Sequence, residues 1–274
     1  MSDRTFRFGV VAMPTAGPGE WTTTTRRIEE LGYSTVLMPD GLQLLAPFSS
    51  LALAASATKE LRVGTFVLAS SLRPPLSAAW EGHSLSVLTD GRFEFGIGTG
   101  RPDAKTFAER LGLPFGTGGE RLRQMGEAID HLRELDGDQR TPVLVAAAGP
   151  KALDLAAEKA DIVTLAARPL ATRDEVAGMA GRLRSAAGER ADDIEIAMNL
   201  FVVGDDVPPW VRAFTGTDAA TLVANDSLAM LRGSVTEMAD ELQRRRDALG
   251  VSYVSVNSAF VEAFAPVVER LAGR

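Results

Sequence analysis

The sequence predicts an α/β fold in which eight parallel strands alternate with eight helices, a (β/α)8 TIM barrel, and three observations lead to this prediction. Short apolar segments of the kind that form buried parallel strands alternate along the chain with helical segments. The 274 residues are enough for a lean barrel. No low-complexity linker divides the chain, so we expect one domain over residues 1–274. A doubly wound open sheet is the alternative, because it has the same alternation.

The first half of the chain contains four strand–helix units. Each expected strand is an apolar run rich in β-branched and aromatic residues, and glycine or proline residues separate it from the next helix. Gly32 ends the first helix, because glycine readily adopts the left-handed conformation that closes a helix. The expected strands are 6–13, 34–39, 62–69 and 92–97, and the expected helices are 20–31, 47–59, 75–88 and 118–135.

The second half repeats this order of elements. Leu249-Gly250 ends a helix and leads at once into a strand, as Leu31-Gly32 does in the first half. Long segments after the strands and short joints before them suit a barrel that covers a ligand at one end. The expected strands are 142–146, 161–165, 194–203 and 251–256, and the expected helices are 151–158, 173–187, 236–249 and 260–271.

The composition excludes several classes of protein. The absence of cysteine excludes disulfides, thiolate metal sites and cysteine nucleophiles. The two histidines, His83 and His131, lie in expected helices, so we expect neither a metal site nor a Ser-His-Asp relay. A net charge of −7 argues against a nucleic-acid partner. No apolar run reaches the roughly 18 residues of a membrane helix and no signal-peptide pattern is present, so we expect a cytoplasmic protein without a membrane partner.

The strand ends carry the candidate site, because the loops after barrel strands form the ligand-binding face. Ala147, Ala148, Gly149 and Pro150 follow an expected strand and open a helix. Their small size and the positive helix end favour an anion such as a phosphate group. A tight turn that serves packing alone is an equally good interpretation.

Two further strand ends offer ligand contacts. Asp40 follows the second strand, where its carboxylate either accepts a hydrogen bond from a ligand or caps a turn. Thr99 and Gly100 follow the fourth strand, where glycine allows a ligand to approach the backbone closely. Each of these patterns is a weak signal on its own.

Cationic and aromatic side chains near the strand ends are candidates for substrate binding. Arg101 and Arg168 lie just past expected strands and are suited to holding an anionic group. Trp21 and Trp210 lie beside expected loops, where an indole can form the wall of a pocket. These residues predict a small-molecule substrate.

Three stretches of the sequence carry a resemblance to a known family. They are Leu61-Arg62-Val63-Gly64-Thr65, the run Leu88-Thr89-Asp90-Gly91-Arg92-Phe93-Glu94-Phe95-Gly96-Ile97-Gly98-Thr99-Gly100, and the segment from Ala148-Gly149-Pro150 to Ala160-Asp161. Together they resemble the bacterial luciferase-like monooxygenase family, and within it the oxidoreductases that use the deazaflavin coenzyme F420. The resemblance extends over residues 6 to about 165.

The resemblance implies a luciferase-like barrel that holds a flavin or deazaflavin at the carboxyl ends of its strands. It implies a cis peptide bond between Phe66 and Val67, with the cofactor ring against the backbone from Val67 to Ala69. It places Asp40 near the ring. The remaining implied contacts are Thr99 and Gly100 near the cofactor tail, and Ala147, Ala148, Gly149 and Pro150 as the phosphate-binding turn.

Two departures from the family refine the expected activity. Many relatives carry a histidine after the aspartate of the second strand, where this chain has Gly41, and the sugar-phosphate dehydrogenases of the family carry a glutamate where it has Arg101. Both differences favour an enzyme that consumes reduced F420 and transfers hydride to a C=C or C=N bond of a small metabolite, with a proton from Asp40, a tyrosine or water. The alternatives are an FMN-dependent monooxygenase and a non-catalytic flavin-binding barrel.

The outer helices predict a homodimer. Residues 47–58 contain no charged side chain, and small apolar residues dominate both 49–57 and 76–87. Because an ordinary outer helix of a barrel shows charge on its solvent face, these helices leave an apolar patch that an interface would cover. The alternative is that the long loops of the same chain cover them.

Overall fold

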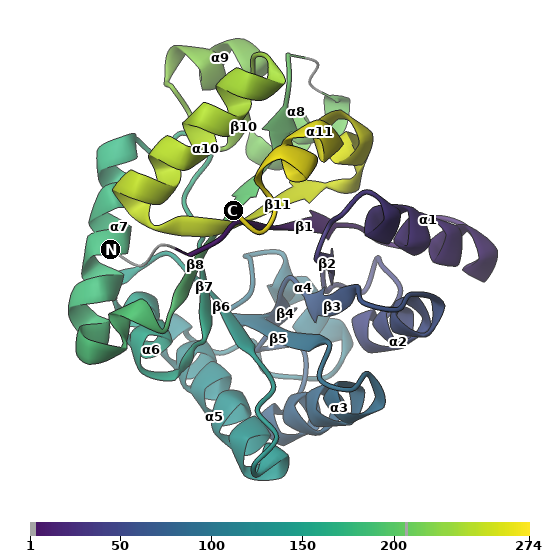
Figure 1. Cartoon of the computed structure of the whole chain (residues 1–274). Helices are drawn as coiled ribbons and strands as arrows, with labels where there is room; N and C mark the ends of the chain where they lie inside the picture. The colour runs from purple at the N-terminus through teal and green to yellow at the C-terminus, as the bar shows by residue number, and fades with distance from the viewer. Residues whose placement is uncertain (1–3, 206–207) are drawn as a thin grey trace.

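The computed structural model describes residues 4–205 and 208–274, and it confirms the closed (β/α)8 barrel (Figure 1). All neighbouring barrel strands are parallel, and the ring closes because β3 pairs with both β2 and β5. Around the ring, the order is β3, β2, β1, β11, β8, β7, β6 and β5. The strands are β1 (Arg7–Val11), β2 (Thr35–Met38), β3 (Arg62–Thr65), β4 (Leu68–Ala69), β5 (Phe93–Gly98), β6 (Val143–Ala147), β7 (Ile162–Leu165), β8 (Glu195–Leu200) and β11 (Val251–Asn257).

The third barrel strand is interrupted between β3 and β4. The peptide bond between Phe66 and Val67, which lie in the gap, is cis, as the family resemblance implies. After the gap, β4 continues to pair with β5, so the ring stays closed. The interruption therefore changes the shape of the strand at the carboxyl end of the barrel and leaves the topology unchanged.

Eight helices cover the outside of the barrel, as predicted. Four of them begin at a proline, whose missing N–H costs nothing in the first turn. Three others begin with a Ser or Thr cap and a glutamate three residues later, which together satisfy the first free N–H groups. The outer helices are α1 (Pro18–Glu30), α2 (Pro47–Ala57), α3 (Pro75–Leu88), α5 (Gly118–Asp136), α6 (Pro150–Lys159), α7 (Arg173–Ala187), α10 (Val235–Leu249) and α11 (Val261–Leu271).

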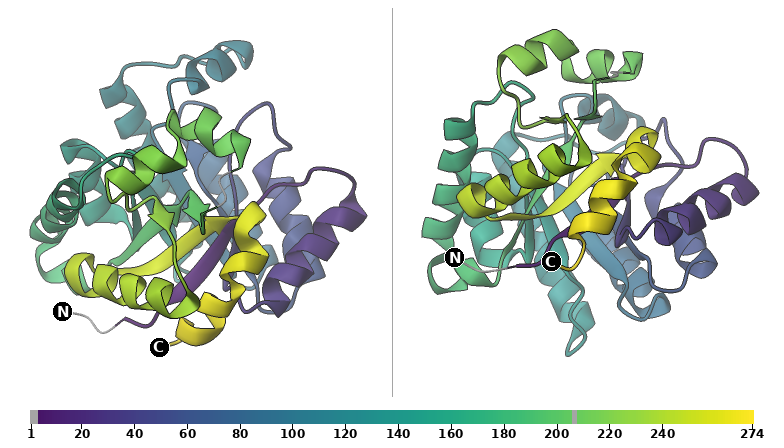
Figure 2. Two further views of the ribbon diagram at one scale, coloured as in Figure 1. Left: turned by 90° about the horizontal axis from the view of Figure 1, so that it is seen from above. Right: turned by 45° about the horizontal axis from the view of Figure 1, so that its top comes forward.

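Short elements inside two loops were not predicted. The loop after β5 contains α4 (Ala104–Arg110), and the connection from β8 to α10 contains several further elements. Instead of the single expected strand 194–203, the chain forms two strands, β8 and β9, which Phe201 separates. Figure 2 shows α8 and α9 (green) apart from the ring of outer helices. The remaining elements are β9 (Val202–Val203), α8 (Pro209–Thr215), α9 (Ala219–Ala224), β10 (Met230–Leu231), and the 3₁₀ helices η1 (Gly188–Asp192) and η2 (Ser258–Phe260).

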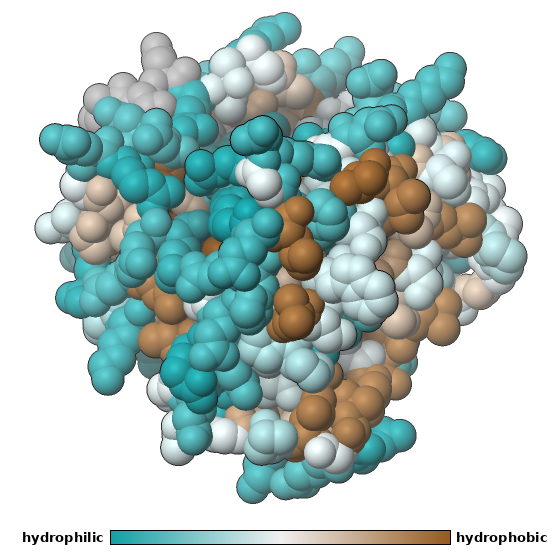
Figure 3. Space-filling model, turned by 90° about the horizontal axis from the view of Figure 1, so that it is seen from below, coloured by the Kyte–Doolittle hydropathy of each residue, from teal (hydrophilic) through white to brown (hydrophobic). Residues whose placement is uncertain are grey.

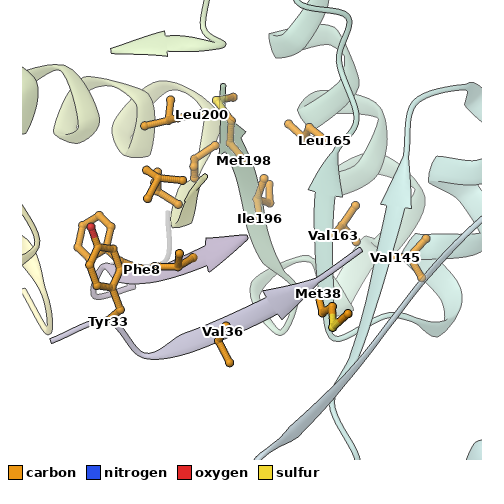
Figure 4. Packing of buried hydrophobic residues seen from close by; sticks show 14 of the residues in the cluster. Phe8, Tyr33, Val36, Met38, Val145, Val163, Leu165, Ile196, Met198 and Leu200 are labelled. Carbon is orange, nitrogen blue, oxygen red and sulfur yellow. The ribbon is translucent and has the colours of Figure 1, made fainter. Parts of the chain in front are cut away.

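The main core lies between the strands and the outer helices. Every second residue along a strand belongs to this core, as do Val36 and Met38 of β2, Val163 and Leu165 of β7, and Ile196 and Met198 of β8, which Figure 4 labels. Each fully buried side chain of this size contributes about 1.5–3 kcal/mol relative to an exposed one. This shell of apolar contacts fixes the position of every strand end.

The inside of the barrel is organised in layers along its axis. At the amino ends of the strands, Arg7 forms ion pairs with Glu94 at 2.7 Å and with Glu195 at 2.6 Å. Above them lies a buried apolar layer that includes Leu144 and Ile162. The layer at the carboxyl ends opens into a cavity, so the barrel is plugged at one end and accessible at the other. Within the described ranges, no helix is both long and apolar enough to cross a membrane.

Candidate functional site

A cavity of about 800 Å³ lies at the carboxyl ends of the barrel strands. Its volume falls in the range typical of small-molecule sites. Inward-facing residues of β1, β6, β7, β8 and β11 form its floor, and Trp210 and Leu228 from the segment that contains α8 and α9 contribute to its wall. The described residues lining the cavity are mostly apolar and include no Asp, Glu, Lys or His.

One wall of the cavity is built around the cis peptide bond. Phe66 and Val67 line the cavity, as does Ala146 from β6. Gly98 of β5 lies behind this wall, where an added Cβ would come within 2.9 Å of Val67 Cγ2 and 3.5 Å of the Ala146 Cβ. A side chain at position 98 would therefore displace Val67. A wall of apolar side chains is suited to a planar ring.

Polar groups gather on the opposite arc of the floor, on three neighbouring strands. Thr164 of β7, Asn199 of β8 and Asn257 of β11 all line the cavity. The side-chain oxygen of Asn199 accepts a hydrogen bond from the Ser255 hydroxyl at 2.9 Å. The side-chain oxygen of Asn257 accepts one from the Ala259 N–H at 3.0 Å and thereby caps η2.

Sequence reasoning missed this polar arc. The signal was an asparagine near the end of each of two otherwise apolar strands, a residue type that β strands disfavour. Only the barrel geometry shows that the two strands are neighbours, since they are more than fifty residues apart along the chain and pair through Asn199 and Ser255.

Asp40 is held in an ion pair. Its side chain is only 5% exposed, and its two oxygens accept hydrogen bonds from Arg73 at 2.7 and 3.2 Å. One of these oxygens also accepts a hydrogen bond from the Ala69 N–H at 3.2 Å. Asp40 does not line the cavity, and both of its oxygens are occupied by donors from the protein. The geometry thus argues against Asp40 as a proton donor.

The two tyrosines of the chain, Tyr33 and Tyr253, are both buried. The Tyr33 hydroxyl donates to the carbonyl of Val261 at 2.8 Å, and burial raises its pKa. Tyr253 lies under the guanidinium of Arg7 near the closed end of the barrel, 3.6 Å from Arg7 Cζ to the ring centroid, and burial raises its pKa as well. Neither tyrosine lines the cavity.

The remaining predicted cofactor contacts form a rim along three adjacent strands. Ala69 ends β4, Thr99 and Gly100 follow β5, and the turn from Ala147 to Pro150 joins β6 to α6. Ala147 is buried, whereas Ala148, Gly149 and Pro150 are exposed at the amino end of α6. These residues lie beside the apolar wall at Phe66 and Val67, outside the lining of the cavity itself.

The two predicted substrate-binding arginines both line the cavity. Arg168 is 81% exposed and pairs with Glu175 at 3.1 Å, so it lies at the rim. Arg101 follows β5 and lies 3.7 Å from Asp103. Since each arginine has a carboxylate beside it, the positive charge that the two present to a ligand is partly balanced.

The prediction for Trp21 was wrong. Its indole is 1% exposed in the core between α1 and α2, and its N–H donates to the carbonyl of Ser50 at 2.8 Å. The apolar face of α1 accounts for this position, because residues Trp21, Thr25 and Ile28 follow helical spacing. Trp210 takes the predicted role as a cavity wall.

Arg245 of α10 supports the wall formed by the α8–α9 segment. Its guanidinium is 3% exposed and donates to the carbonyls of Leu228 at 2.8 Å and Met230 at 3.0 Å. It also pairs with Glu241 at 2.8 Å. Leu228 lines the cavity, so this buried cation fixes the backbone of the cavity wall from behind.

Comparison with known proteins shows what this architecture resembles. Residues 6–213 match the family model described as luciferase-like monooxygenase. An F420-dependent glucose-6-phosphate dehydrogenase from Intrasporangium calvum is 32% identical over 133 residues, which is 45% of this chain. The match spans about 40% of the length of that relative.

Solved structures share the whole fold. An F420-dependent secondary alcohol dehydrogenase in complex with an F420–acetone adduct superposes with a TM-score of 0.78 at 18% identity, covering 96% of this chain and 98% of that one. The long-chain alkane monooxygenase LadA superposes with a TM-score of 0.75 at 13% identity, covering 97% and 91%. At these identities, the likeness establishes the fold alone.

Proposed function

The chain belongs to the luciferase-like monooxygenase family, and on this premise we propose that it is an oxidoreductase that uses reduced coenzyme F420 to transfer hydride to a C=C or C=N bond of a small molecule. The observation that carries the proposal is the apolar wall of the cavity at Phe66 and Val67, where Gly98 leaves room for the Val67 side chain. The F420-dependent relative and the F420-dependent dehydrogenase structure support the choice of cofactor.

The residues along the rim suit the rest of such a cofactor. The exposed turn of Ala148, Gly149 and Pro150 at the amino end of α6 would hold a phosphate group. Thr99 and Gly100 would contact the tail, and Gly100 adopts a φ of +81°, which favours glycine. Asp40, fixed by Arg73, would hold the polar edge of the ring beside Ala69.

The protein residues bind, orient and exclude water. Bound reduced F420 supplies a hydride equivalent. The apolar lining, which includes Met13, Phe201 and Trp210, would exclude bulk water from the reacting atoms. Because Asp40 is paired and both tyrosines lie elsewhere, we assign the proton to a water molecule. Arg101 and Arg168 would attract an anionic substituent of the substrate.

An FMN-dependent monooxygenase is the second candidate function, because the family model is described as luciferase-like monooxygenase and an alkane monooxygenase shares the fold. The deciding experiment is a titration of the purified protein with F420 and with FMN, followed by absorbance and fluorescence. We expect F420 to bind more tightly and its reduced form to be consumed without oxygen. Tight binding of FMN alone, with oxygen uptake, would overturn the proposal in favour of the monooxygenase.

We also propose that the protein forms a homodimer through α2 and α3. Several large apolar side chains on these helices are exposed, including Trp80 at 64% and Leu88 at 79%. Figure 3 shows apolar patches on the side of α1, α2 and α3, while hydrophilic side chains cover the opposite half of the same face. Patches of this kind are typical of interfaces.

A further inference from the structure

We propose that the substrates are apolar α,β-unsaturated carbonyl compounds whose carbonyl oxygen accepts hydrogen bonds from the side-chain amides of Asn199 and Asn257. This inference rests on the proposed function, since it assigns the molecule that receives the hydride. Its basis is that the side-chain oxygens of both asparagines already accept hydrogen bonds within the protein, which leaves their amide N–H groups for a ligand.

Both asparagines use their oxygen atoms internally. Asn199 Oδ1 accepts from Ser255, and Asn257 Oδ1 accepts from the backbone N–H of Ala259. Across the described chain, neither amide nitrogen has a protein acceptor. Neither nitrogen is among the solvent-inaccessible atoms that lack a hydrogen-bond partner, so both remain accessible. Because both residues line the cavity, their N–H groups are the donors available there.

The floor of the cavity therefore offers donors to a ligand that brings an acceptor. Asn199 lies on β8 and Asn257 on the adjoining β11, two residues beyond the partner of Asn199, so both side chains belong to the same end of the barrel interior. Two neutral donors on neighbouring strands are suited to a single oxygen with two lone pairs. A carbonyl oxygen has this property, whereas an imine nitrogen has one lone pair.

The charges around the cavity favour the same choice. Binding of an iminium would place a positive charge in the cavity, and the described lining includes Arg101 and Arg168 but no carboxylate to balance that charge. Reduction of an unsaturated carbonyl places negative charge on oxygen, which amide N–H groups stabilise in a site that excludes water. A C=C bond conjugated to a carbonyl thus fits better than a C=N bond.

The remaining lining defines the rest of the substrate. Val11, Met13, Met198 and Phe201 surround the floor, so the groups attached to the carbonyl and to the double bond would be hydrocarbon. A cavity of about 800 Å³ leaves room for such groups in addition to a cofactor ring.

The reaction balances as follows. The hydride of reduced F420 forms a C–H bond at the β-carbon, and the π electrons of the C=C bond move onto the carbonyl oxygen as an enolate. Asn199 and Asn257 donate to that oxygen while it carries the charge. A water molecule then protonates the α-carbon and becomes hydroxide, which would be neutralised by the proton that reduced F420 gives up as it is oxidised by two electrons.

The test compares two ligands that differ only at the oxygen. Benzylideneacetone presents an acceptor, and the allylic alcohol formed by reducing its carbonyl presents a hydroxyl. Each would be titrated by calorimetry into the protein loaded with oxidised F420, so that no turnover occurs. Asn199→Asp and Asn257→Asp keep the internal acceptor oxygen and remove the N–H donors. Gln243→Glu makes the same amide-to-acid change at an exposed position of α10.

We expect the unmodified protein and Gln243→Glu to bind the ketone at least about fivefold more tightly than the alcohol, and each aspartate variant to lose that preference or reverse it. With reduced F420, the aspartate variants should also lower kcat for the ketone. Equal weakening of both ligands by the aspartate variants, or an absence of preference in the unmodified protein, would overturn the inference.

F420 affinity, measured separately by cofactor fluorescence, keeps this result distinct from the proposed function. If F420 fails to bind, the proposed function fails, while the ketone preference can still be measured in the protein alone. If F420 binds and the preference does not depend on the asparagines, only the inference fails.

Discussion

The guanidinium of Arg73 holds both oxygens of the Asp40 carboxylate, at 2.7 and 3.2 Å, at the carboxyl ends of two neighbouring barrel strands. The same carboxylate binds the Ala69 N–H, so it connects the end of β2 to the end of β4 directly beside the interrupted strand. This pair therefore shapes the part of the rim where the cofactor ring is proposed to lie.

Replacing Arg73 with Met should lower the free energy of unfolding by about 3–5 kcal/mol, because Asp40 would keep a buried charge without its partner. Asp40→Asn combined with Arg73→Met should recover part of that loss. Denaturant unfolding followed by circular dichroism measures both. Arg168→Met is the matched control, since it removes an exposed ion pair and should change stability by less than about 1 kcal/mol. An equal effect of the two single substitutions would contradict this role of Arg73.

The ion pairs of Glu94 at the closed end of the barrel should make the free energy of unfolding depend on pH. Burial by itself would raise the pKa of Glu94, but the guanidinium groups of Arg7 and Arg62 outweigh burial and hold the pKa below its ordinary value of 4.5. A carboxylate with a lowered pKa in the folded state stabilises the fold above its unfolded pKa, and this contribution is lost as the pH falls. The free energy of unfolding should thus decrease below about pH 4.5.

Glu94→Gln separates this cause from general acid unfolding. At pH 7, the variant should be less stable, because Arg7 and Arg62 lose the carboxylate that they share. Between pH 5 and about pH 3, its stability should fall less steeply than that of the unmodified protein. Parallel curves for the two proteins would show that Glu94 is not the responsible group.

Arg245 should control the order of the cavity wall. Arg245→Met removes the donors to the carbonyls of Leu228 and Met230, so hydrogen exchange should accelerate over 228–231 and the free energy of unfolding should fall by about 2–4 kcal/mol. Arg244, the preceding residue of the same helix, also pairs with Glu241, but its side chain is 65% exposed, so Arg244→Met is the control. It should leave exchange over 228–231 unchanged, and acceleration in both variants would contradict the assignment.

The fold could be predicted from the sequence because its signals are local. Apolar strands, helix caps such as Gly32 and Gly250, and the initial prolines are each visible within a few residues. The α-helices that were missed, α4, α8 and α9, have six or seven residues each, which is too few to establish a helical period.

Reasoning from strand ends and loops located Arg101, Arg168 and Trp210, and the family resemblance supplied Phe66 and Val67; all five line the cavity. The Asp40–Arg73 pair and the asparagine arc depend on contacts between different strands, which no local pattern reveals. Trp21 shows the converse error, since its place beside a loop suggested exposure while its helical spacing placed it in the core.

The apolar wall of the cavity at Phe66 and Val67 should not tolerate an added methyl group at Gly98. Gly98→Ala would press against Val67 Cγ2, from which an added Cβ is 2.9 Å away, and we expect F420 to bind about tenfold more weakly. Fluorescence titration of the cofactor measures this change. In contrast, Gly178→Ala on exposed α7 meets nothing within 4 Å, and should raise stability by about 0.5–1 kcal/mol without changing affinity. Unchanged affinity in Gly98→Ala would place the ring elsewhere.

The proposed dimer can be tested at Trp80, which is 64% exposed on α3 and is the type of residue that dominates interface energetics. Light scattering at micromolar concentration should give twice the chain mass of 29.1 kDa for the unmodified protein. Trp80→Glu should give the single-chain mass, because the two-fold symmetry of a dimer places the new charge in the interface twice. Val223→Glu adds the same charge on α9, at the opposite end of the molecule in Figure 1, and should leave the dimer intact. A particle of 29.1 kDa for the unmodified protein would instead mean that the apolar patch over α2 and α3 stays exposed to solvent.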